Sequence, residues 1–222
     1  MSHLDLIEIL KQNPEYELEL RIGKKNNEKF QSGLKQALFD QICDELSKCE
    51  EILTKDESWH ESMDVFFDFN NEEYRTRVNY FSSTMKITSQ TIKKKRVKNV
   101  HVNLQSNYAF RVSLSEEKNI DPEHVPPIVY PKHVRLKHTK HFFLNSGGVK
   151  TWCICASKTW GGPTRTEVEK LQHIETPIYE LEVELVDTNV YLATKSCDHI
   201  FRSIVQKGCS LLGTPEATYT VS

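Results

Sequence analysis

The chain has 222 residues, of which 38% are hydrophobic and 27% are charged, and its formal net charge is −2. This length suits one domain with a substantial core, and we expect a single globular domain over residues 1–222. Because the chain is nearly neutral, we do not expect a basic surface that extends over the whole protein and binds duplex nucleic acid. Any contact with nucleic acid must therefore come from a local cluster of cations.

Cysteine spacing argues against a zinc site, and hydropathy argues against a secreted or membrane-spanning protein. Six cysteines lie at positions 43, 49, 153, 155, 197 and 209, and no two of them form a CxxC pair, so the spacing does not indicate a tetrahedral zinc site. Residues 1–13 are polar and mixed, unlike a secretory signal, and no apolar run approaches the roughly 20 residues that span a bilayer. We expect a reduced intracellular protein without a membrane partner. These features do not separate nucleus, cytosol and virion.

Hydrophobic periodicity predicts helices near both ends of the chain and one helix after the first strand. The N-terminal part is predicted to form a helix over His3–Lys11, a strand over Tyr16–Ile22, a turn over Gly23–Asn27 and a helix over Phe30–Leu53. The C-terminal part is predicted to form a strand over Tyr179–Val186 and a helix over Thr188–Leu212.

The middle of the chain alternates with period two, as half-buried strands do. Strands are expected at Met63–Phe69, Tyr74–Phe81, Met85–Asn103, Tyr108–Leu114, Val129–Leu144 and Val149–Thr159. Turns are expected at Asn70–Asn71, Ser82–Ser83, Ser106–Asn107 and Asn145–Gly148, and loops at Asp121–Pro127 and Gly161–Pro163. About eight strands thus follow one another in antiparallel order, and closing the sheet removes its edges. The expected fold class is α+β, a closed antiparallel eight-stranded β-barrel with flanking helices.

The first and last predicted strands carry acidic residues on one face. Residues at alternate positions share a face: Glu17, Glu19 and Arg21 in the first strand, and Glu180, Glu182 and Glu184 in the last. Such neighbours lie roughly 7 Å apart, so each pair of like charges costs about 2 kcal/mol at an effective dielectric of about 20. In an enclosed site this pattern requires a counter-charge, which a hard divalent cation with oxygen ligands supplies. The alternative is a solvated acidic face.

The strands between them carry cations in the same alternating way. Pairs that share a face are Arg75 with Arg77, Lys93 with Lys95, and Arg135 with Lys137. Closing such a sheet brings glutamates opposite lysines and arginines, in an interior that cannot be a plain hydrophobic core. A polyphosphate with its metal suits this interior, because arginine and lysine hold phosphate oxygens while carboxylates hold the cation. The alternative for Lys93–Lys98 is a solvated face or a nuclear address.

At these residues the chain resembles the triphosphate tunnel metalloenzymes, in particular the metal-dependent RNA 5′-triphosphatases of fungi, protozoa and large DNA viruses. The resemblance spans most of the chain, from Glu15 to Leu212, as dispersed motifs. These motifs are residues 17–23, the segment 113–116, the basic residues of segment 135–140, and residues 180–184. Arg21, where the wider superfamily often has lysine, favours the type that acts in mRNA capping.

The resemblance implies a role for each of these residues. Removal of the γ-phosphate from triphosphate-ended RNA would use Mg²⁺ or Mn²⁺ coordinated by Glu17, Glu19 and Glu184. Metal waters would be held by Glu180 and Glu182, and the attacking water would be positioned or deprotonated by Glu116, with Glu117 as the second choice. Phosphates would be held by Arg77, Lys93, Arg111, Arg135, Lys137 and Lys140. A guanylyltransferase is the implied partner, with a nuclear location in a cell or a cytoplasmic one for a virus.

Two residues depart from the family's pattern. Thr139 stands where the third alternating cation of the basic strand falls, so Lys140 reaches the site only if a β-bulge shifts the register. Cys155 stands nearest to the position that often carries an aspartate, and a thiol is a poor ligand for a hard cation. Two alternatives therefore stay open: hydrolysis of inorganic tripolyphosphate or nucleoside triphosphate, and a non-catalytic phosphate-binding subunit of a capping complex. The terminal helices also leave a homodimer possible.

Overall fold

The structure is a computed structural model, described here for residues 3–26, 29–81, 86–104, 106–125, 130–146, 149–214 and 219–221. Its N-terminal half contains α1 (His3–Gln12), β1 (Glu17–Asn26), β2 (Lys29–Ser32), α2 (Gln36–Lys48), β3 (Ile52–Lys55), β4 (His60–Phe69), β5 (Glu72–Phe81) and β6 (Lys86–Leu104). Its C-terminal half contains β7 (Ala109–Ile120), a 3₁₀ turn (Pro122–His124), β8 (His133–Ser146), β9 (Val149–Gly162), α3 (Arg165–Ile174), β10 (Ile178–Leu185), α4 (Thr188–Thr194), α5 (Cys197–Leu211) and β11 (Tyr219–Val221).

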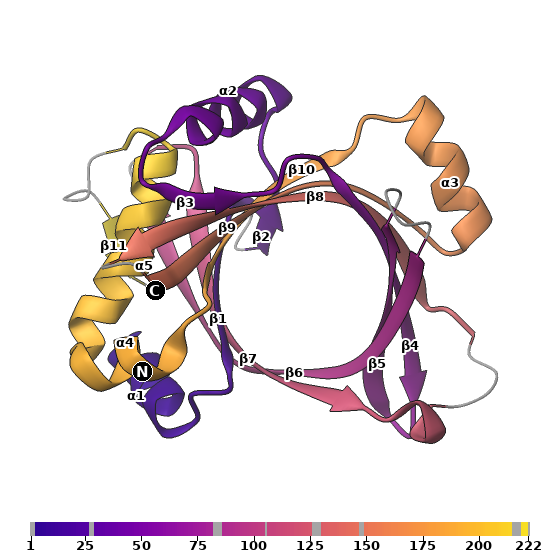
Figure 1. The fold of residues 1–222 in the computed structure, drawn as a ribbon, viewed down its shortest axis with the longest axis horizontal. Coiled ribbons are helices and arrows are strands. Elements are labelled where there is room, and N and C mark those ends of the chain that lie inside the picture. The colour runs from indigo at the N-terminus through magenta and orange to yellow at the C-terminus, as the bar shows by residue number, and fades with distance from the viewer. Residues whose placement is uncertain are drawn as a thin grey trace.

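Eight of the strands close into a barrel, which Figure 1 shows end-on. Their order is β10-β9-β8-β4-β5-β6-β7-β1, every pairing is antiparallel, and β1 pairs with β10 to complete the ring. The expected α+β class with a closed antiparallel eight-stranded barrel is confirmed. The expected consecutive order is wrong at two places, because β8 returns to pair with β4 while β7 pairs with β1.

The hydrophobic core lies outside the barrel, between its wall and the helices. The outer face of β1 carries Leu18, Leu20 and Ile22, all fully buried. They share one cluster with apolar residues of α1, α2 and α5, and Figure 1 shows α1, α4 and α5 together on one side of the barrel. A smaller cluster lies under α3 on the opposite side. This arrangement leaves the inner face of the barrel free for polar side chains.

Several predicted boundaries are wrong because pairing partners lie far away in the sequence. Only residues 36–48 of the predicted helix over 30–53 are helical, since its two ends form β2 beside β1 and β3 beside β8. Residues 23–26 extend β1 instead of turning. The C-terminal helix divides because the Ser196 side chain caps α5, accepting a hydrogen bond from the backbone N–H of His199 at 3.2 Å.

The predicted turns have mixed outcomes. Asn70 and Asn71 both have positive φ, at 52° and 62°, as a tight hairpin between β4 and β5 requires, and this turn is confirmed. The bend at Ser106–Asn107 between β6 and β7 is confirmed as well. Gly161 and Gly162 complete β9 and are followed by α3, a helix the sequence analysis did not predict. The turn at 82–83, residues 147–148 of the next turn, residues 126–127 of the loop, and residues 27, 85 and 129 lie outside the described residues.

None of the helices in the described part of the chain is long and apolar enough to cross a membrane.

The packing of α5 against the barrel can be tested by truncating a buried side chain between them. Phe110 of β7 is fully buried, and a Cβ added to Gly208 of α5 would lie 2.9 Å from its ring. We expect Phe110→Ala to lower the free energy of unfolding by about 3–5 kcal/mol, because the helix cannot close the cavity. Urea unfolding measures this loss. The control Ile174→Ala, at an exposed position, should cost about 0.5 kcal/mol or less, and equal losses would contradict this account of the core.

Candidate functional site

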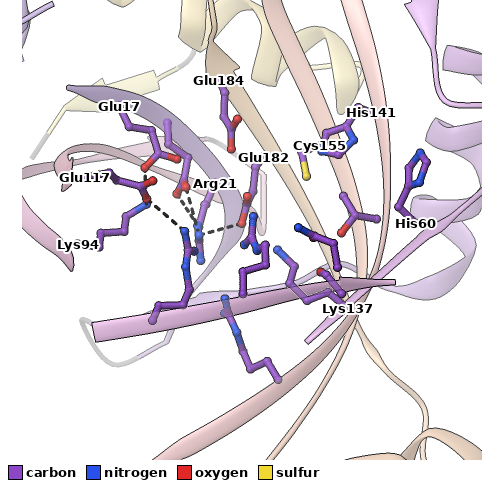
Figure 2. Close-up of a pocket in the computed structure, with 17 residues that line it drawn as sticks. Glu17, Arg21, His60, Lys94, Glu117, Lys137, His141, Cys155, Glu182 and Glu184 are labelled. Atoms are coloured by element: carbon purple, nitrogen blue, oxygen red, sulfur yellow. Dashed lines mark hydrogen bonds and ion pairs between the residues drawn. The ribbon is translucent and has the colours of Figure 1, made fainter. Parts of the chain in front are cut away.

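The inside of the barrel is a charged lumen. A cavity of about 270 Å³ is lined by residues of β1, β4–β10, and a second cavity of about 370 Å³ adjoins it, sharing Arg21, Arg75, Lys94 and Arg135. The remaining lining residues of the first cavity are Glu17, Glu19, His60, Ser62, Arg77, Asn79, Glu117, Lys137, Thr139, His141, Cys155, Glu182 and Glu184. Figure 2 shows these side chains directed into a common space. A lumen of this composition is built to hold charged ligands.

Three carboxylates from the two ends of the chain meet in the lumen. Glu19 of β1 pairs with Glu184 of β10 in the sheet, and one carboxylate oxygen from each of Glu17, Glu19 and Glu184 lies within 4.8 Å of the others. Burial and the neighbouring carboxylates raise the pKa of Glu17 to about 7 and that of Glu184 to about 8, although Lys94 opposes both shifts. An all-oxygen donor set whose negative charge is only partly balanced by Lys94 and Arg21 fits a hard divalent cation such as Mg²⁺ or Mn²⁺.

A second group of carboxylates is held by arginine. The Arg21 guanidinium contacts Glu19 and lies 2.9 Å from the Glu182 carboxylate. Burial raises the pKa of Glu182, but the charges of Arg21, Lys137 and Arg135 outweigh it and lower the pKa to about 2. Glu180, buried on the same face of β10, accepts a hydrogen bond from the Thr159 hydroxyl at 3.0 Å. Glu182 therefore stays anionic and fixes the position of Arg21.

Asp64 organises the arginines on the other side of the lumen. Its fully buried carboxylate accepts hydrogen bonds from Nε and Nη2 of Arg77 at 2.7 and 3.1 Å and from Arg135 at 3.4 Å. Burial raises its pKa, yet the bonds from Arg77 and the surrounding cations hold that pKa well below the ordinary range. Asp64 thus stays charged and keeps two guanidinium groups side by side.

Lys94 and Glu117 form a third cluster next to the carboxylates. The Lys94 ammonium contacts Glu17 and lies 2.8 Å from Glu117, which is also 3.5 Å from Arg75. Although burial raises the pKa of Glu117, Lys94 and Arg75 hold it below the ordinary value. The cluster places an ionised carboxylate beside Glu17, and Figure 2 shows Lys94 in contact with both.

Several guanidinium donors in the lumen have no partner among the described residues. The Nε atoms of Arg75, Arg111 and Arg135 are buried and make no hydrogen bond within the part of the chain that the structure describes. Burial and the charges of Arg21 and Arg96 lower the pKa of Arg111. Buried donors without acceptors are costly, and a phosphate oxygen is the acceptor that arginine suits best.

The structure brings most of the predicted site residues together. Those that line the lumen are Glu17, Glu19, Arg77, Arg135, Lys137, Glu182 and Glu184. Glu180 shares the inner face of β10, and Arg111 lies directly opposite Arg21 on the inner face of β7. Cys155 pairs with Glu182 in the sheet, and burial raises the pKa of its thiol well above the ordinary value, so it stays neutral.

Three predicted residues point away from the lumen. Glu116 forms an ion pair with Lys118 at 2.7 Å, and Lys93 forms one with Glu72 at 2.6 Å, both on the outer face of the barrel. Lys140 lies over the ring of Phe142, a core residue outside the barrel. β8 keeps its register with β9 from 134 to 144, so no bulge brings Lys140 inward. A strand alternates its faces, and a shift of one residue exchanges inside for outside.

Other lumen residues were missed. Arg75 shares the face of Arg77 and could have been included by alternation alone. Lys94 could not be identified in this way. It belongs to a run of four cations, residues 93–96, in which both faces of the strand are basic. His141 and His60 also line the cavity, and both approach Asp56, with His141 Nδ1 at 2.7 Å and His60 Nε2 at 3.4 Å. No sequence pattern marks these histidines, because their shared partner Asp56 lies outside every predicted strand.

A closed eight-stranded barrel with a lumen of facing carboxylates, lysines and arginines defines the triphosphate tunnel fold, as the motifs indicated. The RNA triphosphatase Pct1 of S. pombe, in a structure with the Spt5 CTD, is 15% identical with a TM-score of 0.67, covering 94% of this chain and 92% of that one. The Mimivirus capping enzyme triphosphatase is 11% identical with a TM-score of 0.58, covering 94% and 95%. At these identities the likeness concerns the fold. No family model and no curated protein matches the sequence.

Asp64 gives a test of how the lumen is held together. We expect Asp64→Asn to lower the free energy of unfolding at pH 7 by about 2 kcal/mol, which is below the value of about 3–5 kcal/mol for a fully buried pair because Arg77 is partly exposed. Since the folded-state pKa of Asp64 is depressed, its contribution is present above the ordinary carboxyl pKa of about 4 and is lost as the pH falls below it. Urea unfolding at pH 7 and pH 3 measures both effects. Asp68→Asn, whose carboxylate pairs with Lys132 at the surface, is the control, and equal losses would contradict the assignment.

The carboxylate cluster gives a test of cation binding. With raised pKa values, Glu17 and Glu184 hold protons near pH 7 that the unfolded chain does not, so stability without cation falls as the pH rises from about 5 to 8. A divalent cation must displace these protons, and we expect about one proton released per ion at pH 7. Calorimetric titration with Mg²⁺ or Mn²⁺ in buffers of different ionisation heat measures the release. Glu184→Gln should reduce it, and heats independent of the buffer would contradict it.

Proposed function

We propose that this chain hydrolyses the terminal phosphate of 5′-triphosphate-ended RNA with the help of a divalent cation. The proposal is carried by one observation: a cluster of three carboxylates and a belt of partly unpaired arginines and lysines face each other inside the barrel. The carboxylates suit a cation, the belt suits phosphate oxygens, and both are enclosed by the same eight strands. The shared fold with two RNA triphosphatases supports this assignment.

The acidic residues divide into two tasks. Glu17, Glu19 and Glu184 would hold Mg²⁺ or Mn²⁺, which supplies Lewis-acid stabilisation of charge on the phosphate oxygens. Glu182 and Glu180 would stay outside direct coordination. Glu182 holds Arg21, and Glu180 is held by Thr159. Both fix the geometry of the wall next to the carboxylate cluster.

The cations bind the polyphosphate. Arg77 and Arg135 are presented together by Asp64, and Lys137 is buried in the same wall, so these three groups hold the terminal phosphate. Lys93 and Lys140 take no part, since both lie on the outer face. The arginine Nε donors that lack partners would gain phosphate oxygens, which stabilise the charge that develops as the phosphate transfers.

Glu117 takes the water-positioning role first assigned to Glu116. It lines the lumen beside Lys94 and Arg75 and is ionised, so its carboxylate can accept a hydrogen bond from a water on the far side of the γ-phosphorus. The water oxygen bonds to that phosphorus as the bond to the β–γ bridging oxygen breaks. The water's protons pass to solvent or to the phosphate released, and the products are a diphosphate end and inorganic phosphate.

In this proposal the substrate is nascent RNA, the reaction is the first step of capping, and a guanylyltransferase takes the diphosphate product. The related alternative is hydrolysis of inorganic tripolyphosphate or a nucleoside triphosphate, which would fill the same lumen. Competition between these compounds and triphosphate-ended RNA separates the two. Binding without turnover would instead support a phosphate-binding subunit, an outcome that Cys155 and Thr139 favour.

Adjacent residues on opposite faces of one strand provide the main test. We expect Glu117→Gln to lower kcat by about 100-fold or more, because one group that positions or stabilises the reacting atoms is typically worth that much. Glu116→Gln, on the outer face, should leave kcat unchanged. The same contrast should hold for Lys94→Ala against Lys93→Ala. Release of labelled phosphate from γ-labelled triphosphate RNA, with and without Mg²⁺ or Mn²⁺, measures all four.

Two outcomes would count against the proposal. Phosphate release that does not depend on a divalent cation or on Glu184 would remove the carboxylate cluster from the reaction. Equal effects of Glu116→Gln and Glu117→Gln would show that the lumen is not where the chemistry occurs.

A further inference from the structure

The two ends of the lumen differ in charge. The second cavity lies toward the β4–β5 hairpin and is lined by Arg21, Arg75, Lys94, Arg96 and Arg135 against a single acid, Glu73. We refer to these six residues with Phe66 and Tyr74 as the basic mouth. The rest of the first cavity holds Glu17, Glu19, Glu117, Glu182 and Glu184 against Arg77 and Lys137. A polyanion is therefore attracted to one end and repelled by the other.

Aromatic rings stand beside arginines in the basic mouth. The ring of Phe66 lies 5.0 Å from the Arg135 guanidinium and 6.1 Å from the ring of His133. On the wall near Arg21, the ring of Phe30 lies 5.0 Å from the Arg111 guanidinium and stacks on His101 at 6.0 Å. Arg111 lies opposite Arg21, which lines the basic mouth, so both clusters of phenylalanine, arginine and histidine lie toward this end of the lumen.

Each cluster rests on a glycine of a neighbouring strand. A Cβ on Gly23 would lie 2.7 Å from the ring of Phe30, and a Cβ on Gly161 would lie 3.0 Å from the ring of His133. Any larger residue would push these rings away from the wall. Both histidines also have lowered pKa values, caused by burial and then by Lys25 and Arg111 for His101 and by Arg135 for His133, so near neutral pH they present uncharged flat faces.

Two arginines at this end remain available to a ligand. Neither Arg96 nor Arg111 forms an ion pair within the described part of the chain, and the buried Nε of Arg111 makes no hydrogen bond there. Arg96 is exposed. Guanidinium groups next to aromatic faces are the combination that binds single-stranded nucleic acid, because the arginines hold the backbone phosphates while the bases stack.

We infer that the basic mouth, together with the neighbouring Phe30 and Arg111, is the binding site for the first nucleosides of an RNA chain, with bases stacked on Phe66 and Phe30 and backbone phosphates on Arg96 and Arg111. This inference rests on the proposed function. It gives the substrate a direction: the polynucleotide lies outside the basic mouth, the triphosphate extends into the lumen, and the terminal phosphate reaches the carboxylates near the opposite end. It also selects a polynucleotide over inorganic tripolyphosphate, which has no base to stack.

The chain contains a matched control at the opposite end. Phe143 lies 4.7 Å from the Lys150 ammonium and 6.2 Å from the ring of His141, the last histidine of the lumen on β8. It offers the same kind of aromatic and cationic surface, but beside the acidic side of the lumen. A truncation there removes a ring without touching the basic mouth.

The experiment measures binding, so it does not depend on turnover. A short triphosphate-ended RNA labelled at its 3′ end is titrated with each variant by fluorescence anisotropy, with Ca²⁺ as the cation, and inorganic tripolyphosphate is titrated by competition. We expect Phe66→Ala and Phe30→Ala to lower the ratio of RNA affinity to tripolyphosphate affinity by about 5- to 100-fold, the range for one lost base stack. Phe66→Trp should restore the ratio, and Phe143→Ala should leave it unchanged.

The inference is overturned if neither Phe66→Ala nor Phe30→Ala changes this ratio, or if only Phe143→Ala lowers it. Failure of the proposed function looks different: the wild-type protein would bind the RNA with the expected ratio but release no phosphate in Mg²⁺ or Mn²⁺.

Discussion

Charged side chains enclosed within a protein must be paired or must bind a ligand, and this constraint organises the whole molecule. The inner face of the barrel carries charge on nearly every strand. The hydrophobic core therefore lies outside the barrel, between its wall and the helices. Asp64, Glu182 and Glu117 each hold neighbouring cations. Beyond these pairs, the cluster of Glu17, Glu19 and Glu184 keeps excess negative charge, and the Nε donors of Arg75, Arg111 and Arg135 have no acceptor among the described residues. A divalent cation would balance the charge of the carboxylates, and a polyphosphate would accept hydrogen bonds from the arginines.

Closure of the barrel creates the carboxylate cluster. Glu17 and Glu19 lie near one end of the sequence and Glu184 near the other, and only the pairing of β1 with β10 brings them within reach of each other. The outer faces of the same strands are packed under α1, α2 and α5. The apolar half of the alternating pattern thus anchors the strands, while the acidic half faces the lumen. A single alternating pattern serves both stability and binding.

The charge of the lumen changes along the barrel axis as well as across it. One end is dominated by arginine and aromatic rings, the other by carboxylates, with His60 and His141 held by Asp56 between the strands at that end. A symmetrical tunnel would accept a polyphosphate in either direction. Unequal ends impose an orientation, since the electrostatic energy of a polyanion differs between them. In the proposed function, this orientation would place the terminal phosphate next to the cation.

Alternation with period two was sufficient, in the sequence alone, to predict an antiparallel barrel and to place Glu17, Glu19, Glu182, Glu184, Arg77, Arg135 and Lys137 on polar strand faces. It could not choose the face where the pattern was ambiguous. In the run of cations at residues 93–96 every face is basic, and in the pair Glu116–Glu117 both faces are acidic. Pairing across the sheet determines that Lys94 and Glu117 face the lumen, because the register is set by partners distant in the chain.

Tertiary structure alone decided the remaining features. The β-bulge between Arg96 and Lys98 exchanges the two faces of β6 partway along its length, which no local pattern signals. Asp64 is one of three acids in β4, and it anchors two arginines only because β4 lies between β5 and β8. Local periodicity is encoded in neighbouring residues and can be read from them. Which charges meet depends on strand order and register, and these are set by long-range packing.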